Sequence, residues 1–214
     1  MRETLRRYRI PLFAAALVAV AGYGALTLIK RPQAPHIATG PVQDDLSRLN
    51  RGVDSVALRD DAGQSLRWGD LKGRPRAVFF GFTHCPVICP VTVWELNNAL
   101  DKIGAPAEPI AIQFITLDPA RDTPEALEKY FAGFNGRVDA YAATPEATAA
   151  LAGAFEVVYR RTEVDGGDYT IDHTPTVFLL DASGRVVDVI GYGAPPEVVE
   201  TRLRALVSAR PKAG

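Results

Sequence analysis

Cysteine, histidine and methionine are scarce in this chain of 214 residues. There are two cysteines, Cys85 and Cys89, three histidines, and one methionine, Met1. Two cysteines cannot build a four-cysteine zinc or iron–sulfur site, and they cannot form the disulfide framework of a small secreted domain. The lack of further methionine excludes a methionine-rich copper-binding tract. The sequence therefore offers one cluster of soft metal ligands at most.

An excess of basic residues is also missing from most of the chain. Residues 1–31 contain six Lys and Arg against one acid, which leaves 18 basic against 24 acidic side chains from residue 32 onward, a formal net charge of −6. No basic stripe is present to follow a phosphate backbone, so nucleic acid is not an expected partner. Apolar residues at 47% and charged residues at 23% are typical of an ordinary globular domain.

Residues 10–29 form an uncharged run of twenty residues, IPLFAAALVAVAGYGALTLI. This length matches the roughly 30 Å hydrocarbon core of a bilayer, so the run predicts one transmembrane anchor. A cleaved signal peptide is the competing interpretation, but its apolar run would be about 7 to 15 residues long and would end in small residues rather than in Lys30, Arg31 and Pro32.

The four arginines before the run place residues 1–9 in the cytoplasm and the rest of the chain in the periplasm. No Arg-rich, Ser-rich transit peptide precedes the run, which favours a bacterial inner membrane over an organelle. After a linker at 30–50, the soluble domain is expected at 51–210.

Within this domain, the hydrophobic pattern predicts alternating strands and helices. Strands are expected at 76–82, 109–116 and 155–160, and two hairpins at 53–68 and 176–191; helices are expected at 91–103, 123–134, from Thr144 and at 195–210; residues 162–173 are expected as a loop. After the N-terminal hairpin this gives the order β-α-β-α-β-α-β-β-α. The predicted fold class is therefore α/β, a thioredoxin-like sandwich with an N-terminal β-hairpin extension, preceded by one transmembrane helix.

The two cysteines lie where a buried strand ends and a helix begins, which is where open α/β sheets place their ligands. Pro86 suits the first position of that helix, so the Cys85 sulfur should lie beside backbone N–H groups that lower a thiol pKa. On a regular helix the C-x-x-x-C spacing puts the two Cβ atoms about 5 to 6 Å apart, farther than the roughly 4 Å of a disulfide. A bridging metal tolerates that gap better, although Pro90 loosens the turn and leaves a disulfide open.

His173 is the third expected ligand, because it follows the Gly166-Gly167 loop and precedes the strand TVFLLD, so it can reach over the end of the sheet toward the cysteines. Two thiolates and one imidazole favour Cu(I), whereas Cu(II) or zinc would take a fourth ligand from Asp172, His84 or water. The alternative is that the cysteines are inert core residues and that the histidine is a surface or core residue with no role as a ligand.

Three segments together resemble the Sco/SenC family of copper-binding, thioredoxin-like proteins: FGFTHCPVICP, LDPARDTPEALEKYFAGF and YTIDHTPTVFLLD. The resemblance spans residues 52–191. It implies that Cys85, Cys89 and His173 bind copper. The bound ion would be Cu(I), or Cu(II) if a further ligand is added. It further implies delivery to the CuA-bearing subunit of cytochrome c oxidase, with other copper chaperones as further partners.

The Thr174-Pro175-Thr176 segment departs from the family and resembles the cis-proline segment of ordinary thioredoxins, so we expect a cis Thr174–Pro175 bond. Such a segment favours an alternative function, thiol–disulfide exchange with Cys85 as nucleophile and Cys89 as resolving thiol. A redox or copper sensor is the third interpretation. In the aspartate-rich block, Asp118 is expected near the site, and Arg121 with Asp122 is expected to pair or to cap the next helix.

Overall fold

The computed structural model describes residues 45–134 and 137–208, all in the unit formed by residues 39–214. The predicted anchor at 10–29, the cytoplasmic residues 1–9 and most of the linker lie outside the described residues. Among the helices that are described, none is both long enough and apolar enough to cross a membrane.

The described domain alternates strands with helices around one large sheet. Its strands are β1 (Ala57–Asp60), β2 (Ser65–Arg67), β3 (Arg76–Gly81), β4 (Ala111–Thr116), β5 (Val138–Ala142), β6 (Tyr159–Glu163), β7 (Tyr169–His173), β8 (Val177–Leu180) and β9 (Val186–Ile190). Its α-helices are α2 (Ile88–Ile103), α3 (Pro124–Phe131), α4 (Pro145–Ala154) and α5 (Pro196–Ser208).

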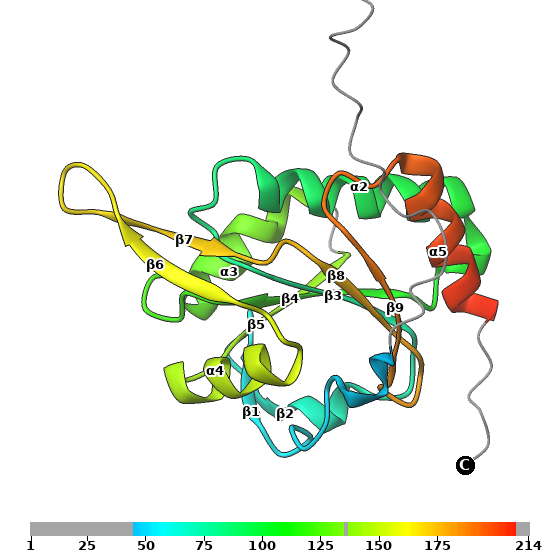
Figure 1. Cartoon of the computed structure of the whole chain (residues 1–214), viewed down its shortest axis with the longest axis horizontal. Helices are drawn as coiled ribbons and strands as arrows, with labels where there is room; N and C mark the ends of the chain where they lie inside the picture. Colours follow the sequence, from blue (N-terminus) through cyan, green and yellow to red (C-terminus); the bar gives the residue numbers. More distant parts are fainter. Residues whose placement is uncertain (1–44, 135–136, 209–214) are drawn as a thin grey trace, which may run out of the picture. The chain divides into compact units, whose positions relative to one another are not determined.

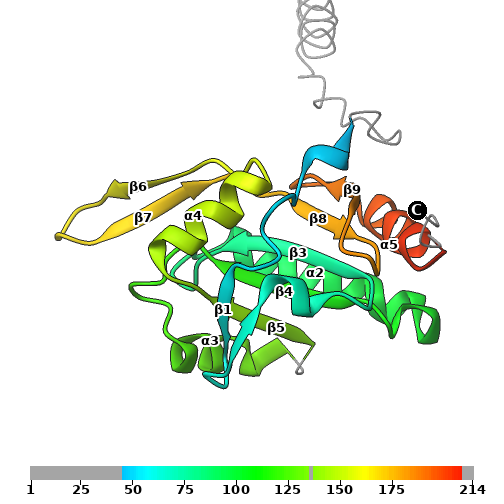
Figure 2. The same cartoon turned by 90° about the horizontal axis from the view of Figure 1, so that it is seen from below.

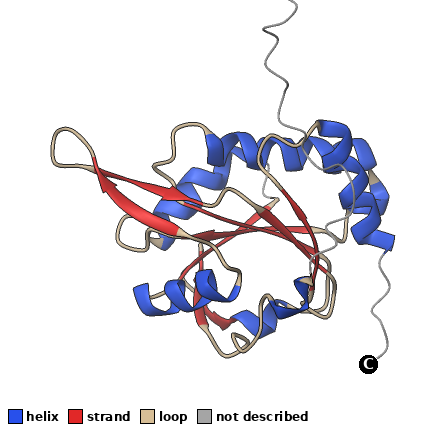
Figure 3. Ribbon diagram, in the orientation of Figure 1, coloured by secondary structure: helices blue, strands red, loops and turns tan. Residues whose placement is uncertain are grey.

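Seven strands form the main sheet in the order β2-β1-β5-β4-β3-β8-β9. The central strands β3, β4 and β5 are parallel, whereas β8 joins β3 antiparallel and continues as the β8–β9 hairpin. In Figures 1 and 3, α2 and α5 lie on one side of this sheet and α4 lies on the other. This is the predicted thioredoxin-like sandwich, and the antiparallel β1–β2 pair at its edge is the predicted N-terminal hairpin.

Strand β3 brings the chain through the core to the site. All six of its residues are buried, as expected for a central parallel strand covered by helices on both faces. Consecutive phenylalanines alternate between the faces: Phe79 packs toward Phe114, and Phe80 packs against Phe155 and Phe178. The carboxyl end of β3 at Gly81 is thus fixed from both sides before the chain enters the cysteine loop.

Helix starts follow the predicted signals in two cases. Thr123 and Thr144 are the N-caps of α3 and α4, each accepting a hydrogen bond from the backbone N–H three residues later, and each is followed by proline at the first helical position. Asp122 therefore does not cap α3.

The prediction that Pro86 is the first residue of helix α2 is wrong. The helix begins at Ile88 with Val87 as N-cap, so Pro86 and Cys85 precede it. The regular i to i+4 helical geometry assumed for the two cysteines does not apply, because only Cys89 lies on the helix. Its first turn contains Pro90, whose missing N–H needs no partner there.

The segment expected as a strand at 155–160 and a loop at 162–173 is instead a second small sheet. Strands β6 and β7 pair antiparallel, from Tyr159 opposite His173 to Glu163 opposite Tyr169. This pair is separate from the main sheet and extends away from it in Figures 1 and 2. Two successive glycines at its tip, Gly166 and Gly167, take positive φ angles of 87° and 81°, which makes the tight reversal possible.

The expected cis bond before Pro175 is also wrong, because no peptide bond among the described residues is cis. Thr174 continues the β6–β7 pairing: its N–H donates to the Val158 carbonyl at 2.9 Å, and its hydroxyl accepts from the Val158 N–H at 3.2 Å. The chain therefore enters β8 as an extended trans segment. The argument for thiol exchange that rested on a cis-proline is lost.

Candidate functional site

Cys85 lies in the loop between β3 and α2. Its N–H donates to the Phe82 carbonyl at 3.2 Å, which turns the chain, and the residue is 9% exposed. The N-cap residue Val87 has no side-chain acceptor for the helix, and the Cys85 sulfur accepts the Cys89 N–H at 3.4 Å instead. The sulfur of Cys85 thus occupies the position of a capping group at the N-terminus of α2, as the sequence predicted in outline.

Cys89 is fully buried in the first turn of α2. Its sulfur lies against the end of β3, where the absence of a side chain at Gly81 makes room for it. A Cβ atom at Gly81 would lie 2.8 Å from the Cys89 sulfur and 2.8 Å from a ring carbon of Phe114. Any larger residue at 81 would displace the sulfur, so Gly81 is a site residue that the sequence pattern did not single out.

His173 ends β7 and faces the cysteines. Its Nε2 atom lies 3.9 Å from the Cys89 sulfur, and its Nδ1 atom lies 3.2 Å from the Thr174 carbonyl oxygen. A carbonyl can only accept, so the proton of a neutral ring belongs on Nδ1 and the lone pair of Nε2 points to the thiols. The rings of Phe79 and Phe82 contact the imidazole edge to face, with centroids about 6 Å away.

The two further ligands considered from the sequence have other partners. Asp172 accepts a hydrogen bond from the Thr162 hydroxyl at 2.7 Å and lies 3.7 Å from Arg160. The Nδ1 atom of His84 lies 3.2 Å from the Thr83 hydroxyl, and its ring is half exposed.

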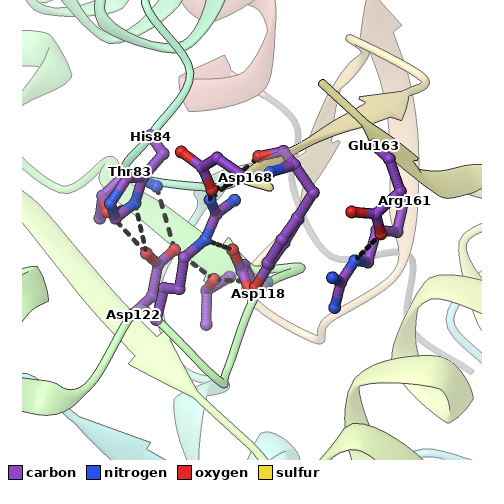
Figure 4. Close-up of polar contacts among 10 residues, drawn as sticks. Thr83, His84, Asp118, Asp122, Arg161, Glu163 and Asp168 are labelled. Atoms are coloured by element: carbon purple, nitrogen blue, oxygen red, sulfur yellow. Dashed lines mark hydrogen bonds and ion pairs between the residues drawn. The ribbon is translucent and has the colours of Figure 1, made fainter. Parts of the chain in front are cut away.

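Asp122 holds the loop that leads to Cys85. Its side chain is fully buried and accepts hydrogen bonds from the Thr83 N–H at 3.0 Å, the Thr83 hydroxyl at 2.6 Å and the Thr116 hydroxyl at 2.5 Å. Figure 4 shows these bonds beside His84. A buried carboxylate with three donors ties the loop after β3 to the end of β4, a role that is neither of the two expected for it.

The two thiols have opposite ionisation preferences. A hydrogen bond from the Cys89 thiol lowers the pKa of Cys85 to about 4, with smaller contributions from the neighbouring His173 ring and the Cys89 backbone N–H, even though burial acts in the other direction. The pKa of Cys89 is raised, because its thiol donates to the Cys85 sulfur and because it is buried. At neutral pH Cys85 is therefore a thiolate and Cys89 a protonated thiol.

An open groove leads to this group. It has a volume of about 350 Å³ and runs between the start of α2 and β7, with Phe82, Cys85, Val87, Ile171 and His173 among its lining residues. Within residues 45–134 and 137–208, no group of three or more His, Cys, Asp and Glu side chains already stands arranged as a metal site. A metal ion entering the groove would therefore have to draw its ligands together.

Comparison with known proteins identifies the family. The SCO1/SenC family model matches residues 47–208. The chain is 32% identical to ScoI of Bradyrhizobium japonicum, solved with copper bound, with a TM-score of 0.64 over 71% of this chain and 96% of that one. Yeast Sco1 with copper bound is 26% identical, with a TM-score of 0.67 over 74% of this chain and 89% of that one. A SCO2-like protein of Rickettsia prowazekii is 27% identical over 83% of this chain and 86% of its own length. The chain belongs to the SCO1/SenC family.

The opposite pKa shifts predict that a small thiol-alkylating reagent modifies Cys85 and not Cys89. Because Cys85 stays ionised until the pH approaches about 4, its alkylation rate should fall little between about pH 8 and pH 5. Peptide mapping by mass spectrometry after timed labelling measures this. A rate that drops about tenfold per pH unit over that range, as for an ordinary thiol, would contradict the assignment.

Proposed function

We propose that this protein is a copper metallochaperone that holds Cu(I) between Cys85, Cys89 and His173. The observation that carries the proposal is the 3.9 Å separation between the Cys89 sulfur and the His173 Nε2 atom, with the Cys85 sulfur at the same helix start. Metal bonds of about 2.3 Å to sulfur and about 2.0 Å to nitrogen, at a trigonal angle, would separate those two atoms by about 3.7 Å. Closure of the Cys89 sulfur and the His173 imidazole on the ion thus requires a small movement.

The composition of the site supports copper over zinc. Two sulfurs and one imidazole form a soft set of low coordination number, which suits Cu(I). Both other side chains considered as fourth ligands, Asp172 and His84, are held by their own hydrogen-bond partners. Similar structures solved with copper bound, from Bradyrhizobium japonicum and yeast, point to the same metal.

The proposal extends to the location of the protein and to the acceptor of its copper. We infer that the protein is anchored in the bacterial inner membrane by residues 10–29, holds its domain in the periplasm and passes copper by ligand exchange to the CuA-bearing subunit of cytochrome c oxidase. The uncharged run and the arginines before it support the anchor and its orientation. Family membership supports the acceptor.

Thiol–disulfide exchange is a second candidate function, favoured by one observation. Cys85 is a thiolate at the groove, and Cys89 is a protonated thiol within reach, which are the states that a nucleophilic and a resolving cysteine need. The same pair could prepare the acceptor's cysteines for metallation. In such exchange His173 forms no covalent bond to either reacting sulfur and only helps to lower the pKa of Cys85, so its substitution should weaken copper binding more than exchange.

The metal proposal predicts one Cu(I) per chain and a dependence on His173. Replacing His173 with Ala removes one of three ligands at the end of a strand, so the fold should persist while Cu(I) affinity falls by about tenfold or more. Competition titration against a chromophoric chelator under anaerobic conditions measures the Cu(I) stoichiometry and the Cu(I) affinity. His84→Ala is the matched control. Binding of zinc in preference to copper, or an unchanged affinity in His173→Ala, would contradict the proposal.

The delivery proposal predicts an oxidase defect that depends on copper supply. Deleting the gene should lower aa3-type oxidase activity most when copper is scarce, and added copper should partly restore it, because abundant ion reaches the acceptor by mass action. Oxidase activity in membranes from cells grown at graded copper concentrations measures this. Rescue by an external thiol reductant but not by copper would favour the exchange function, and no defect at any copper level would favour sensing.

A further inference from the structure

The strand that carries His173 is not held by the main sheet. Strand β7 pairs only with β6, and these two strands form a sheet of their own that extends from the domain in Figure 2. A two-stranded hairpin by itself is at best marginally stable in water. The direction of β7, and with it the position of the imidazole, must therefore be fixed by contacts other than a β-ladder with the core.

Asp118, Arg121 and Tyr169, here named the Arg121 clamp, supply such contacts. The Arg121 guanidinium donates to the Asp118 carboxylate at 2.5 Å and to the Tyr169 carbonyl at 3.0 Å, and it stacks on the Tyr169 ring at 3.6 Å. The Tyr169 hydroxyl donates to the other Asp118 oxygen at 2.8 Å. Figure 4 shows Asp118 in this network together with Asp168, which accepts a further bond from Arg121 at 2.9 Å.

The clamp joins the hairpin to the body of the domain. Asp118 and Arg121 belong to the loop after β4, whereas Tyr169 is the first residue of β7. Asp118 is 4% exposed, and the Arg121 side chain is 17% exposed, so solvent weakens this ion pair far less than the pairs on the outer surface of the hairpin. A planar guanidinium that bonds a carboxylate, bonds a carbonyl and stacks on a ring fixes direction as well as distance.

Side-chain alternation transmits this restraint to His173. Tyr169, Ile171 and His173 lie on one face of β7, because every second residue of a strand points the same way. Tyr169 reaches the clamp, Ile171 is buried at 7% exposure, and His173 faces Cys89. The clamped residue and the ligand are four positions apart, about 13 Å along the strand. The inward face of the strand is therefore held at Tyr169 and at Ile171, the two inward residues before His173.

We propose that the Arg121 clamp is a positioning device for His173, which keeps the imidazole over the two sulfurs while Asp118, Arg121 and Tyr169 never touch the metal. This rests on the proposed function in that the positioned group is taken to be a copper ligand. The clamp's effect on copper binding should accordingly pass through His173 and vanish when that side chain is absent.

A double-mutant cycle tests this dependence. Cu(I) affinity is measured by competition titration for Arg121→Ala, for Arg121→Lys and for the control Arg160→Ala, each with His173 present and with His173→Ala. Arg160 carries the same charge on the same hairpin, but its side chain is 79% exposed and pairs with Asp172. Lysine at 121 keeps the charge but cannot bridge the clamp's acceptors with a planar fork.

With His173 present, Arg121→Ala should weaken Cu(I) binding about tenfold, Arg121→Lys should restore little of it, and Arg160→Ala should change it less than about twofold. In the His173→Ala background all three should change affinity less than about twofold. Equal losses in both backgrounds, or no loss with His173 present, would overturn the proposal. If Arg121→Ala does not fold, Tyr169→Phe removes only the hydroxyl bond to Asp118 and should weaken binding about threefold, again only with His173 present.

A copper-free measurement separates failure of the clamp from failure of the proposed function. In the apoprotein, backbone ¹⁵N relaxation should show that Arg121→Ala lowers the order parameters of Ile171 and His173 and leaves that of Cys89 unchanged. Order parameters that stay the same at all three residues would overturn the clamp. A wild-type protein that binds no Cu(I) would refute the proposed function, and the relaxation data would still decide on the clamp.

Discussion

The site depends on the hydrogen bond from the Cys89 N–H to the Cys85 sulfur. It exists because the chain leaves β3 at Gly81, turns through the Phe82 carbonyl and starts α2 only after the first cysteine. The bond brings the Cys85 sulfur to the positive end of the helix, where it replaces the cap that Val87 cannot provide. The Cys89 thiol donates to the same sulfur and is the main cause that lowers the pKa of Cys85, with a smaller contribution from this N–H. Cys89, buried over Gly81, keeps its proton.

This arrangement suits a protein that must bind a soft ion and release it. In the proposed function, a single thiolate facing an open groove would give the incoming ion one charged ligand, and the second thiol and the imidazole would complete the set. Loading the second sulfur requires the loss of its proton, so binding of the ion and deprotonation of Cys89 are linked. Because His173 lies on a hairpin outside the main sheet, its position depends on side-chain contacts such as those of the Arg121 clamp.

Much of the fold follows from the sequence because its signals are local. The buried run of β3, the Thr-Pro starts of α3 and α4, and the β8–β9 hairpin are all set by neighbouring residues. The β6–β7 pair was missed because β6 is mostly charged and exposed and because β7 has a single buried apolar residue, Ile171, which is too little to mark a strand. The cis bond was wrongly expected at Pro175, since the pairing of Thr174 with Val158 lies outside the residues that suggested it.

At the site, too, local sequence signals could be interpreted and long-range contacts could not. The cysteines and His173 could be selected from residue type and from their positions at strand ends, whereas their supports could not. Gly81 matters through a contact with a sulfur eight residues later, Asp122 through hydrogen bonds to the loop before Cys85, and Arg121 through a ring 48 residues away. Such long-range contacts leave no periodic mark in the chain.

X-ray absorption at the copper edge of the Cu(I)-loaded protein tests the central claim most directly, namely that the fold offers two sulfurs and one imidazole to a single ion. The account predicts a first shell of two sulfurs at about 2.3 Å and one nitrogen at about 2.0 Å, with the nitrogen lost in His173→Ala. A shell with two sulfurs and no nitrogen in the wild-type protein, or one made only of nitrogen and oxygen, would contradict it.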